Sequence, residues 1–72
     1  MIDNTKERLR IGTELAERRK QMGKTQADIA DATGVQRNHI SRIEQGRYSV
    51  GFDTLQAIAD ALDADIRIVP RQ

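Results

Sequence analysis

Apolar residues recur at the spacing of an α-helix along most of the chain. The first such segment covers residues 5–22 and ends at Gly23, which suits the left-handed position after a helix. Asn4 and Glu7, three residues apart, have the spacing of a capping box at its start. The regular apolar positions of this segment are Ile11, Leu15 and Met22. We therefore expect a long first helix.

Three shorter helices are predicted after it. Thr25 and Asp28 form a second capping signal, and the helix that they start ends at Gly34. A third helix is expected over residues 37–45 and a fourth over residues 52–62. The fourth carries a stripe at helical spacing, made of Leu55, Ile58, Ala59 and Leu62.

The pattern changes at residues 64–69, where apolar and polar residues alternate until Pro70. One face of this segment would hold Ala64, Ile66 and Ile68. A lone strand leaves its backbone groups unpaired, so we expect residues 65–69 to pair with the same strand of a second subunit and form a homodimer. Residues 1–3 are the one candidate partner within the chain. Alternatively, the segment is a frayed tail on a dimer made by the helix at 52–62.

The composition fits one small domain. The chain has 72 residues and no cysteine, so packing alone must stabilise a single core over residues 1–72. No apolar run is long enough to cross a membrane, and the basic first 20 residues do not form a signal peptide. We expect a cytoplasmic protein with no membrane partner, no cofactor and no metal. The predicted fold class is all-α, a compact domain of four or five helices with a short C-terminal β-strand.

Charge is unevenly distributed although the net charge is only +1. Residues 18–47 hold seven bases and three acids, whereas residues 48–66 hold four acids and no base. We therefore expect a polarised surface with a basic middle segment.

The third predicted helix has one strongly polar face. At about 100° per residue, five polar side chains fall within an arc of roughly 140°, and Ile40 and Ile43 lie opposite. The five are Arg37, Asn38, Ser41, Arg42 and Gln45. A solvated helix face is the simplest interpretation, but such faces are more often built from Lys and Glu. Arg matches guanine, and Asn and Gln match adenine, so this face suits the edges of DNA bases.

The residues before this helix predict how it meets its neighbour. Gly34 provides a left-handed turn, Ala30 allows two helices to cross closely, and Val35 and Ile40 fill the angle between them. These features indicate a helix-turn-helix at about residues 25–46. The segment TQADIADATGVQRNHISRIEQG resembles the helix-turn-helix of the phage repressor and Cro family (the XRE family). The resemblance extends from about residue 11 to residue 62, and it implies a lambda-repressor-like fold that binds double-stranded DNA.

The resemblance also implies roles for particular residues. Positions that touch bases in relatives are occupied here by Gln36, Arg37, Asn38 and Arg42, with Ser41 close behind. Phosphate contacts are implied for Gln26, Arg47 and Tyr48. Arg19 and Glu44 match a family ion pair that joins the first helix to the third. Two departures stand out: Gln36 is a poor N-cap, and Val50 and Gly51 replace the Pro and Ser common before the fourth helix.

Other classes of function fit less well. His39 is the only histidine and lies at the margin of the packed face, so we expect a partly buried structural residue and no catalytic or zinc site. The serious alternative is a protein-interaction module or an antitoxin that binds a toxin partner. We predict instead a transcriptional regulator, most simply a repressor, that binds a palindromic operator as a homodimer. A phage or plasmid repressor, an antitoxin and a restriction-modification controller all remain compatible with this prediction.

Overall fold

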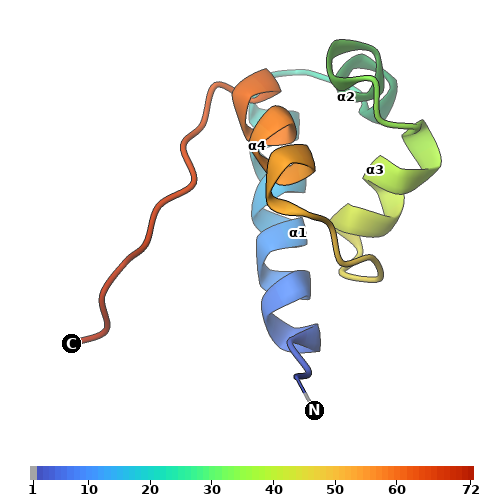
Figure 1. The fold of residues 1–72 in the computed structure, drawn as a ribbon. Coiled ribbons are helices and arrows are strands. Elements are labelled where there is room, and N and C mark those ends of the chain that lie inside the picture. The colour runs from blue at the N-terminus through green and yellow to red at the C-terminus, as the bar shows by residue number, and fades with distance from the viewer. Residues whose placement is uncertain (1) are drawn as a thin grey trace.

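A computed structural model describes residues 2–72 and contains four helices in that range (Figure 1). They are α1 (Thr5–Gln21), α2 (Gln26–Thr33), α3 (Arg37–Glu44) and α4 (Phe52–Ala61). α3 packs against both α1 and α2, and α4 packs against α2. The predicted all-α fold is thus confirmed, with helix ends within a residue or so of those expected.

The capping signal before α2 is confirmed. The Asp28 backbone N–H donates to Thr25 Oγ1 at 3.0 Å, and the Thr25 backbone N–H donates to the Asp28 carboxylate at 2.8 Å. These hydrogen bonds, first from the backbone and then from the side chain of Thr25, lower the pKa of Asp28. Gly34 ends the helix with φ of +77°, the left-handed conformation predicted for it.

The capping box predicted before α1 is wrong. Asn4 makes no side-chain hydrogen bond at this helix start. Instead, Asp3 accepts hydrogen bonds from the Thr5 backbone N–H at 3.1 Å and from the Thr5 hydroxyl at 2.6 Å. An acid one position earlier has taken the capping role, which the spacing of Asn4 and Glu7 could not reveal.

The core lies where α2, α3 and α4 meet. Its buried members are Ile29, Ile40, Ile43, Ile58 and Leu62. Burying each of these side chains stabilises the fold by roughly 1.5–3 kcal/mol. Around them pack partly buried residues that include Leu15, Met22, Ala30 and Val35. The buried cluster therefore comes from α2, α3 and α4, and Leu15 of α1 packs against it.

The C-terminal β-strand is not found. Residues 65–69 form no strand, and no strand occurs anywhere in residues 2–72. The segment leaves α4 as an extended tail (Figure 1), in which Ile68 is 93% and Val69 80% exposed. Ile2 and Asp3 are not in a strand either, and Met1, the other part of the suggested internal partner, lies outside the described residues. Alternating apolar and polar residues allow a segment to join a β-sheet, but residues 2–72 contain no other strand with which this segment could pair.

The predicted C-terminal strand is therefore corrected, whereas the pairing of Ile66 and Ile68 with a second subunit stays a prediction. Ile66 is 40% exposed and does not take part in a β-strand.

None of the helices within residues 2–72 is both long enough and apolar enough to cross a membrane.

Candidate nucleic-acid interface

The outer face of α3 presents polar groups that are free of internal partners. Arg37, Asn38 and Arg42 are exposed, and across residues 2–72 their side chains form no hydrogen bond or ion pair. Ile40 and Ile43 on the opposite face are only 2% and 5% exposed. Three strong donors or acceptors are thus displayed on a helix whose other side is fully packed.

Two more predicted residues, Gln36 and Ser41, extend this face. Gln36 is exposed at the N-cap position of α3 and makes no capping hydrogen bond. Ser41 is half-buried, and its hydroxyl accepts a hydrogen bond from the Gln45 side chain at 3.2 Å. The structure therefore places the predicted base-contacting residues on one continuous surface.

α3 is attached to its neighbours through Glu44. Arg19 of α1 donates from Nε to Glu44 Oε2 at 2.8 Å and from Nη2 to Glu44 Oε1 at 3.0 Å. Gln26, the first residue of α2, donates to the same Oε1 at 3.0 Å. The side chains of Arg19 and Glu44 are only 11% and 10% exposed. This paired carboxylate raises the pKa of Arg19, chiefly through the hydrogen bonds. One carboxylate therefore ties three helices together and fixes the orientation of α3.

Gly12 of α1 also controls the position of α3, and the sequence interpretation missed it. A Cβ atom there would overlap the Ile43 carbonyl oxygen and lie 2.7 Å from the Glu44 carbonyl oxygen. Glycine inside a helix is less favourable than alanine by roughly 0.5–1 kcal/mol, so its presence in the middle of a 17-residue helix was an available signal. Its role is to let the backbones of α1 and α3 touch.

The turn after α3 is ordered by both backbone and aromatic contacts. Gly46 has φ of +73°, and the Arg47 N–H donates to the Arg42 carbonyl oxygen at 2.9 Å. The ring of Tyr48 stacks on that of His39, with centroids 5.1 Å apart and planes inclined by 14°. His39 is half-buried, as predicted. Arg47 and Tyr48 are both exposed beside the end of α3, where phosphate contacts were expected.

Some bases of the middle segment serve the fold. Arg18 donates from Nε to the Leu62 carbonyl oxygen at 2.9 Å, and Lys24 donates from Nζ to that of Ala61 at 3.5 Å. They satisfy carbonyl groups at the C-terminus of α4, whose last turn has no basic residue of its own. The charge count of residues 18–47 therefore overstates the charge available to a ligand.

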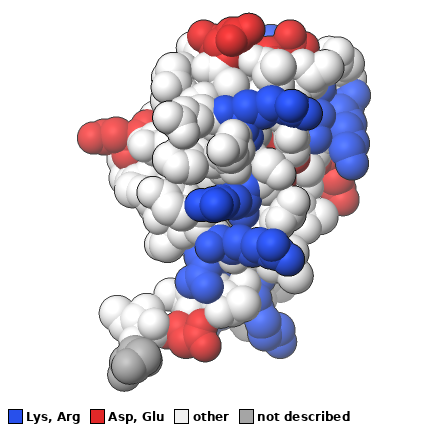
Figure 2. Space-filling view, turned by 90° about the vertical axis from the view of Figure 1, so that its right-hand side faces the viewer, with Lys and Arg blue, Asp and Glu red and all other residues white. Residues whose placement is uncertain are grey.

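The remaining basic side chains still gather on one side. Figure 2 looks onto the side of the molecule formed by α2 and α3, and Lys and Arg side chains run down this face in a broken band. Acidic side chains lie mostly toward its margins. The charge distribution thus favours an anionic ligand on the side that displays the polar face of α3.

Comparisons with known proteins agree with this geometry. The family model described as helix-turn-helix matches residues 15–69. The chain is 32% identical to the ImmF control region 10 kDa protein of Bacillus phage phi105 over 69 residues, which are 96% of this chain and 72% of the relative. It is 42% identical to an uncharacterized HTH-type transcriptional regulator of Methanothermobacter thermautotrophicus over 50 residues, 69% of this chain and 72% of the relative.

A solved structure shows the same fold. The crystal structure of the restriction-modification controller protein C.AhdI from Aeromonas hydrophila superposes with a TM-score of 0.83 and 26% identity, covering 89% of this chain and 93% of that one. The matched family is one of DNA-binding transcription regulators and is not a family of enzymes. The chain therefore belongs to the XRE-type helix-turn-helix family of DNA-binding transcriptional regulators.

Proposed function

We propose that α3 is the recognition helix and lies in the major groove of double-stranded DNA, and that the protein represses transcription by occupying its operator. One observation carries this proposal. Arg37, Asn38 and Arg42 have no partner among residues 2–72, yet they project from a helix held by its buried face and by Glu44. Unpaired donors on a fixed helix are preorganised to bind base edges.

The proposed base contacts follow from the chemistry of this face. A guanidinium can donate two hydrogen bonds to guanine O6 and N7, and an amide can pair with adenine N6 and N7. The groups that would face the bases are Gln36, Arg37, Asn38, Ser41 and Arg42.

The proposed phosphate contacts flank this face. Gln26 uses one amide N–H for Glu44 and keeps a second N–H for a phosphate oxygen. Arg47 and Tyr48 lie exposed just beyond this same C-terminal end of α3. Contacts on two sides of this end of a recognition helix would fix its depth and register in the groove.

Selection of bound sites from random DNA, followed by binding measurements on the selected site, tests the proposal. Arg37→Ala and Arg42→Ala should each weaken binding to that site by about 1–3 kcal/mol and relax the preference at one base pair. Arg47→Ala is the control, because loss of a phosphate contact should weaken binding to all sequences alike. If all three variants lost the same binding affinity for selected and for random DNA, α3 would not be the helix that recognises the bases.

Dimerisation is part of the same proposal, and α4 replaces the C-terminal segment as its basis. Phe52 at the start of α4 is 65% exposed. α4 and α1, together with residues 64–67, also line a groove of about 310 Å³, whose apolar residues include Leu15, Leu55, Ala59 and Leu62. A twofold axis beside α4 would place two copies of α3 on a palindromic operator with half-site centres roughly 34 Å apart.

Sedimentation of two matched variants tests this arrangement. Phe52→Ser should convert a dimer to a monomer, whereas Ile68→Ser, in the exposed tail, should leave the dimer intact. A dimer that survives Phe52→Ser and dissociates with Ile68→Ser would contradict the assignment to α4.

A further inference from the structure

Arg8 on α1 lies directly beside the turn that follows α3. Its Nε donates to the Gly46 carbonyl oxygen at 3.2 Å, and its Nη2 donates to the Thr5 hydroxyl at 3.1 Å. The two backbones touch here, because a Cβ atom at Gly46 would lie 2.7 Å from Leu9 Cα. The guanidinium is therefore fixed relative to the end of α3, although it comes from a different helix.

Arg8 forms no ion pair with a carboxylate, in contrast to its neighbour Arg10. Arg10 pairs with Glu7 at 3.2 Å and with Glu14 at 2.7 Å. Within residues 2–72, no carboxylate lies within ion-pair distance of Arg8. Two of its five N–H groups are donated to uncharged oxygens, so three remain for another acceptor.

The nearest acid is separated from Arg8 by a hydroxyl group. Thr5 accepts from Arg8 and donates to Asp3 at 2.6 Å. The hydrogen bonds from Thr5 and, more weakly, the charge of Arg8 lower the pKa of the Asp3 carboxyl. Asp3 is fully exposed and holds the hydroxyl in place, so it offsets part of the local positive charge without covering the guanidinium.

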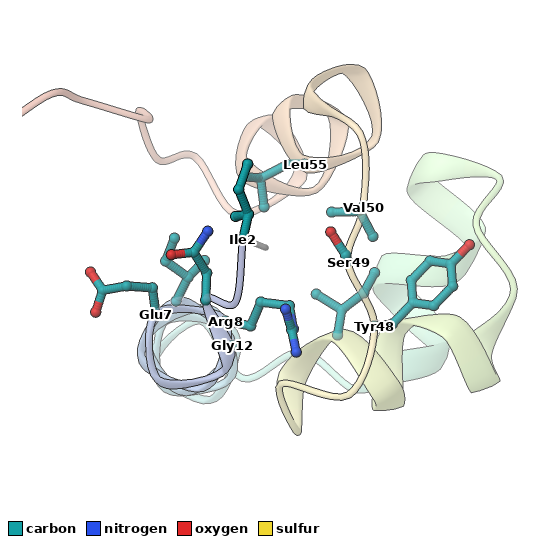
Figure 3. A pocket seen from close by; sticks show the side chains of 11 residues that line it. Ile2, Glu7, Arg8, Gly12, Tyr48, Ser49, Val50 and Leu55 are labelled. Carbon is teal, nitrogen blue, oxygen red and sulfur yellow. The ribbon is translucent and has the colours of Figure 1, made fainter.

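Arg8 also lines a groove next to the segment that follows α3. The groove measures about 400 Å³ and runs between α1 and the segment after α3. Figure 3 shows Arg8 extending from α1 toward the segment that carries Tyr48 and Ser49. Arg47, a proposed phosphate contact, immediately follows the glycine that holds Arg8.

We propose that Arg8 binds a DNA backbone phosphate beyond the C-terminal end of α3, through the N–H groups that it does not donate to Gly46 and Thr5. The inference rests on the proposed function, since it places α3 in the groove. It extends the protein's contact with DNA from the helix-turn-helix to the first helix. Because the Gly46 carbonyl already holds the guanidinium, little side-chain freedom is lost on binding.

The dependence of binding on salt provides the test, with Arg10 as the matched control. Each phosphate contact contributes about 0.9 to the slope of log affinity against log salt concentration. On a random-sequence duplex, Arg8→Met should lower the magnitude of that slope by about 0.9. Arg10→Met removes the same charge from the same helix and should leave the slope unchanged, because Glu7 and Glu14 already pair with Arg10.

The possible outcomes separate this inference from the proposed function. If the unmodified protein bound no DNA, both would fall. If it bound with a normal salt slope that Arg8→Met and Arg10→Met changed equally, only the role of Arg8 would be overturned.

A conservative variant separates phosphate binding from support of the fold. Arg8→Lys keeps the charge but loses the planar fork, so it should retain most of the slope. A purely structural role would leave the slope of all folded variants the same and would appear only as a lower melting temperature. If Arg8→Met did not fold, Arg8→Gln could still donate to Gly46 and would replace it.

Discussion

α3 and the C-terminal tail both expose much of their surface, but they do so in opposite ways. α3 buries Ile40 and Ile43 and turns its polar side chains outward, whereas the tail leaves Ile68 and Val69 in solvent. α3 is attached to α1 and α2 through Glu44, while the tail at residues 65–72 makes no comparable attachment. The difference shows that a local pattern fixes which side chains share a face, and that tertiary contacts decide whether the element is held in place.

The sharpest way to break the fixed position of α3 is to add one methyl group at Gly12. Alanine inside a helix normally stabilises it by roughly 1 kcal/mol relative to glycine. Gly12→Ala should instead destabilise the domain by about 3 kcal/mol, because the added Cβ would overlap backbone atoms of Ile43 and Glu44. Thermal or urea unfolding measures the change.

Gly51→Ala is the control for this prediction. No atom lies within 4 Å of a Cβ placed there, so the free energy of unfolding should change by no more than about 0.5 kcal/mol. A Gly12→Ala variant as stable as the wild type would mean that α1 and α3 do not approach as closely as described.

Removal of one partner from the Glu44 network should have the next largest effect. Arg19→Met leaves a carboxylate that is 10% exposed without its counter-ion, and we expect a loss of about 2 kcal/mol in the free energy of unfolding. The double variant Arg19→Met with Glu44→Leu should recover most of this loss, since it removes the unpaired charge. Additive losses in the double variant would show that the pair is not coupled.

The cap of α2 should give a smaller effect that depends on pH. The pKa of Asp28 is lowered in the folded state, so its contribution is fully present above the unfolded pKa of about 4 and is lost as the pH falls through the lower folded value. Asp28→Ala should therefore be less stable than the wild type at neutral pH, and the two should converge in acid. Urea midpoints across this pH range measure the difference, and Asp31→Ala, an exposed acid of the same helix, should preserve the wild-type trend.

The smallest effect is expected at the tail. Truncation after Arg67 removes the two most exposed apolar residues of this segment and should leave the melting temperature unchanged within about 1 °C. A large drop would show that the tail packs on the domain and that its contrast with α3 is false.

The helix pattern could be predicted because its signals are local. Thr25 and Asp28 lie three residues apart and cap each other, and Gly34 takes the one backbone conformation that favours it. The outward face of α3 follows equally directly from the 100° rotation per residue.

The features that the sequence did not predict depend on contacts between residues far apart in the chain. The role of Gly12 is set by backbone atoms of α3, more than 30 positions away, and Arg18 caps α4 from the far end of α1. The alternating pattern at residues 65–69 showed that these residues can form a strand, but not that an edge exists to pair with them. At the start of α1, Asp3 accepts hydrogen bonds from Thr5 and Asn4 makes no capping hydrogen bond, which the spacing of Asn4 and Glu7 did not indicate.

The stack of Tyr48 on His39 has a spectroscopic consequence. The chain contains one tyrosine and no tryptophan, so all of its tyrosine fluorescence arises from this ring. The fluorophore lies at the turn after α3, in contact with a residue of α3 itself. The intensity and anisotropy of this emission therefore report on the contact between α3 and the turn that follows it. A titration with DNA can be followed there without any attached label.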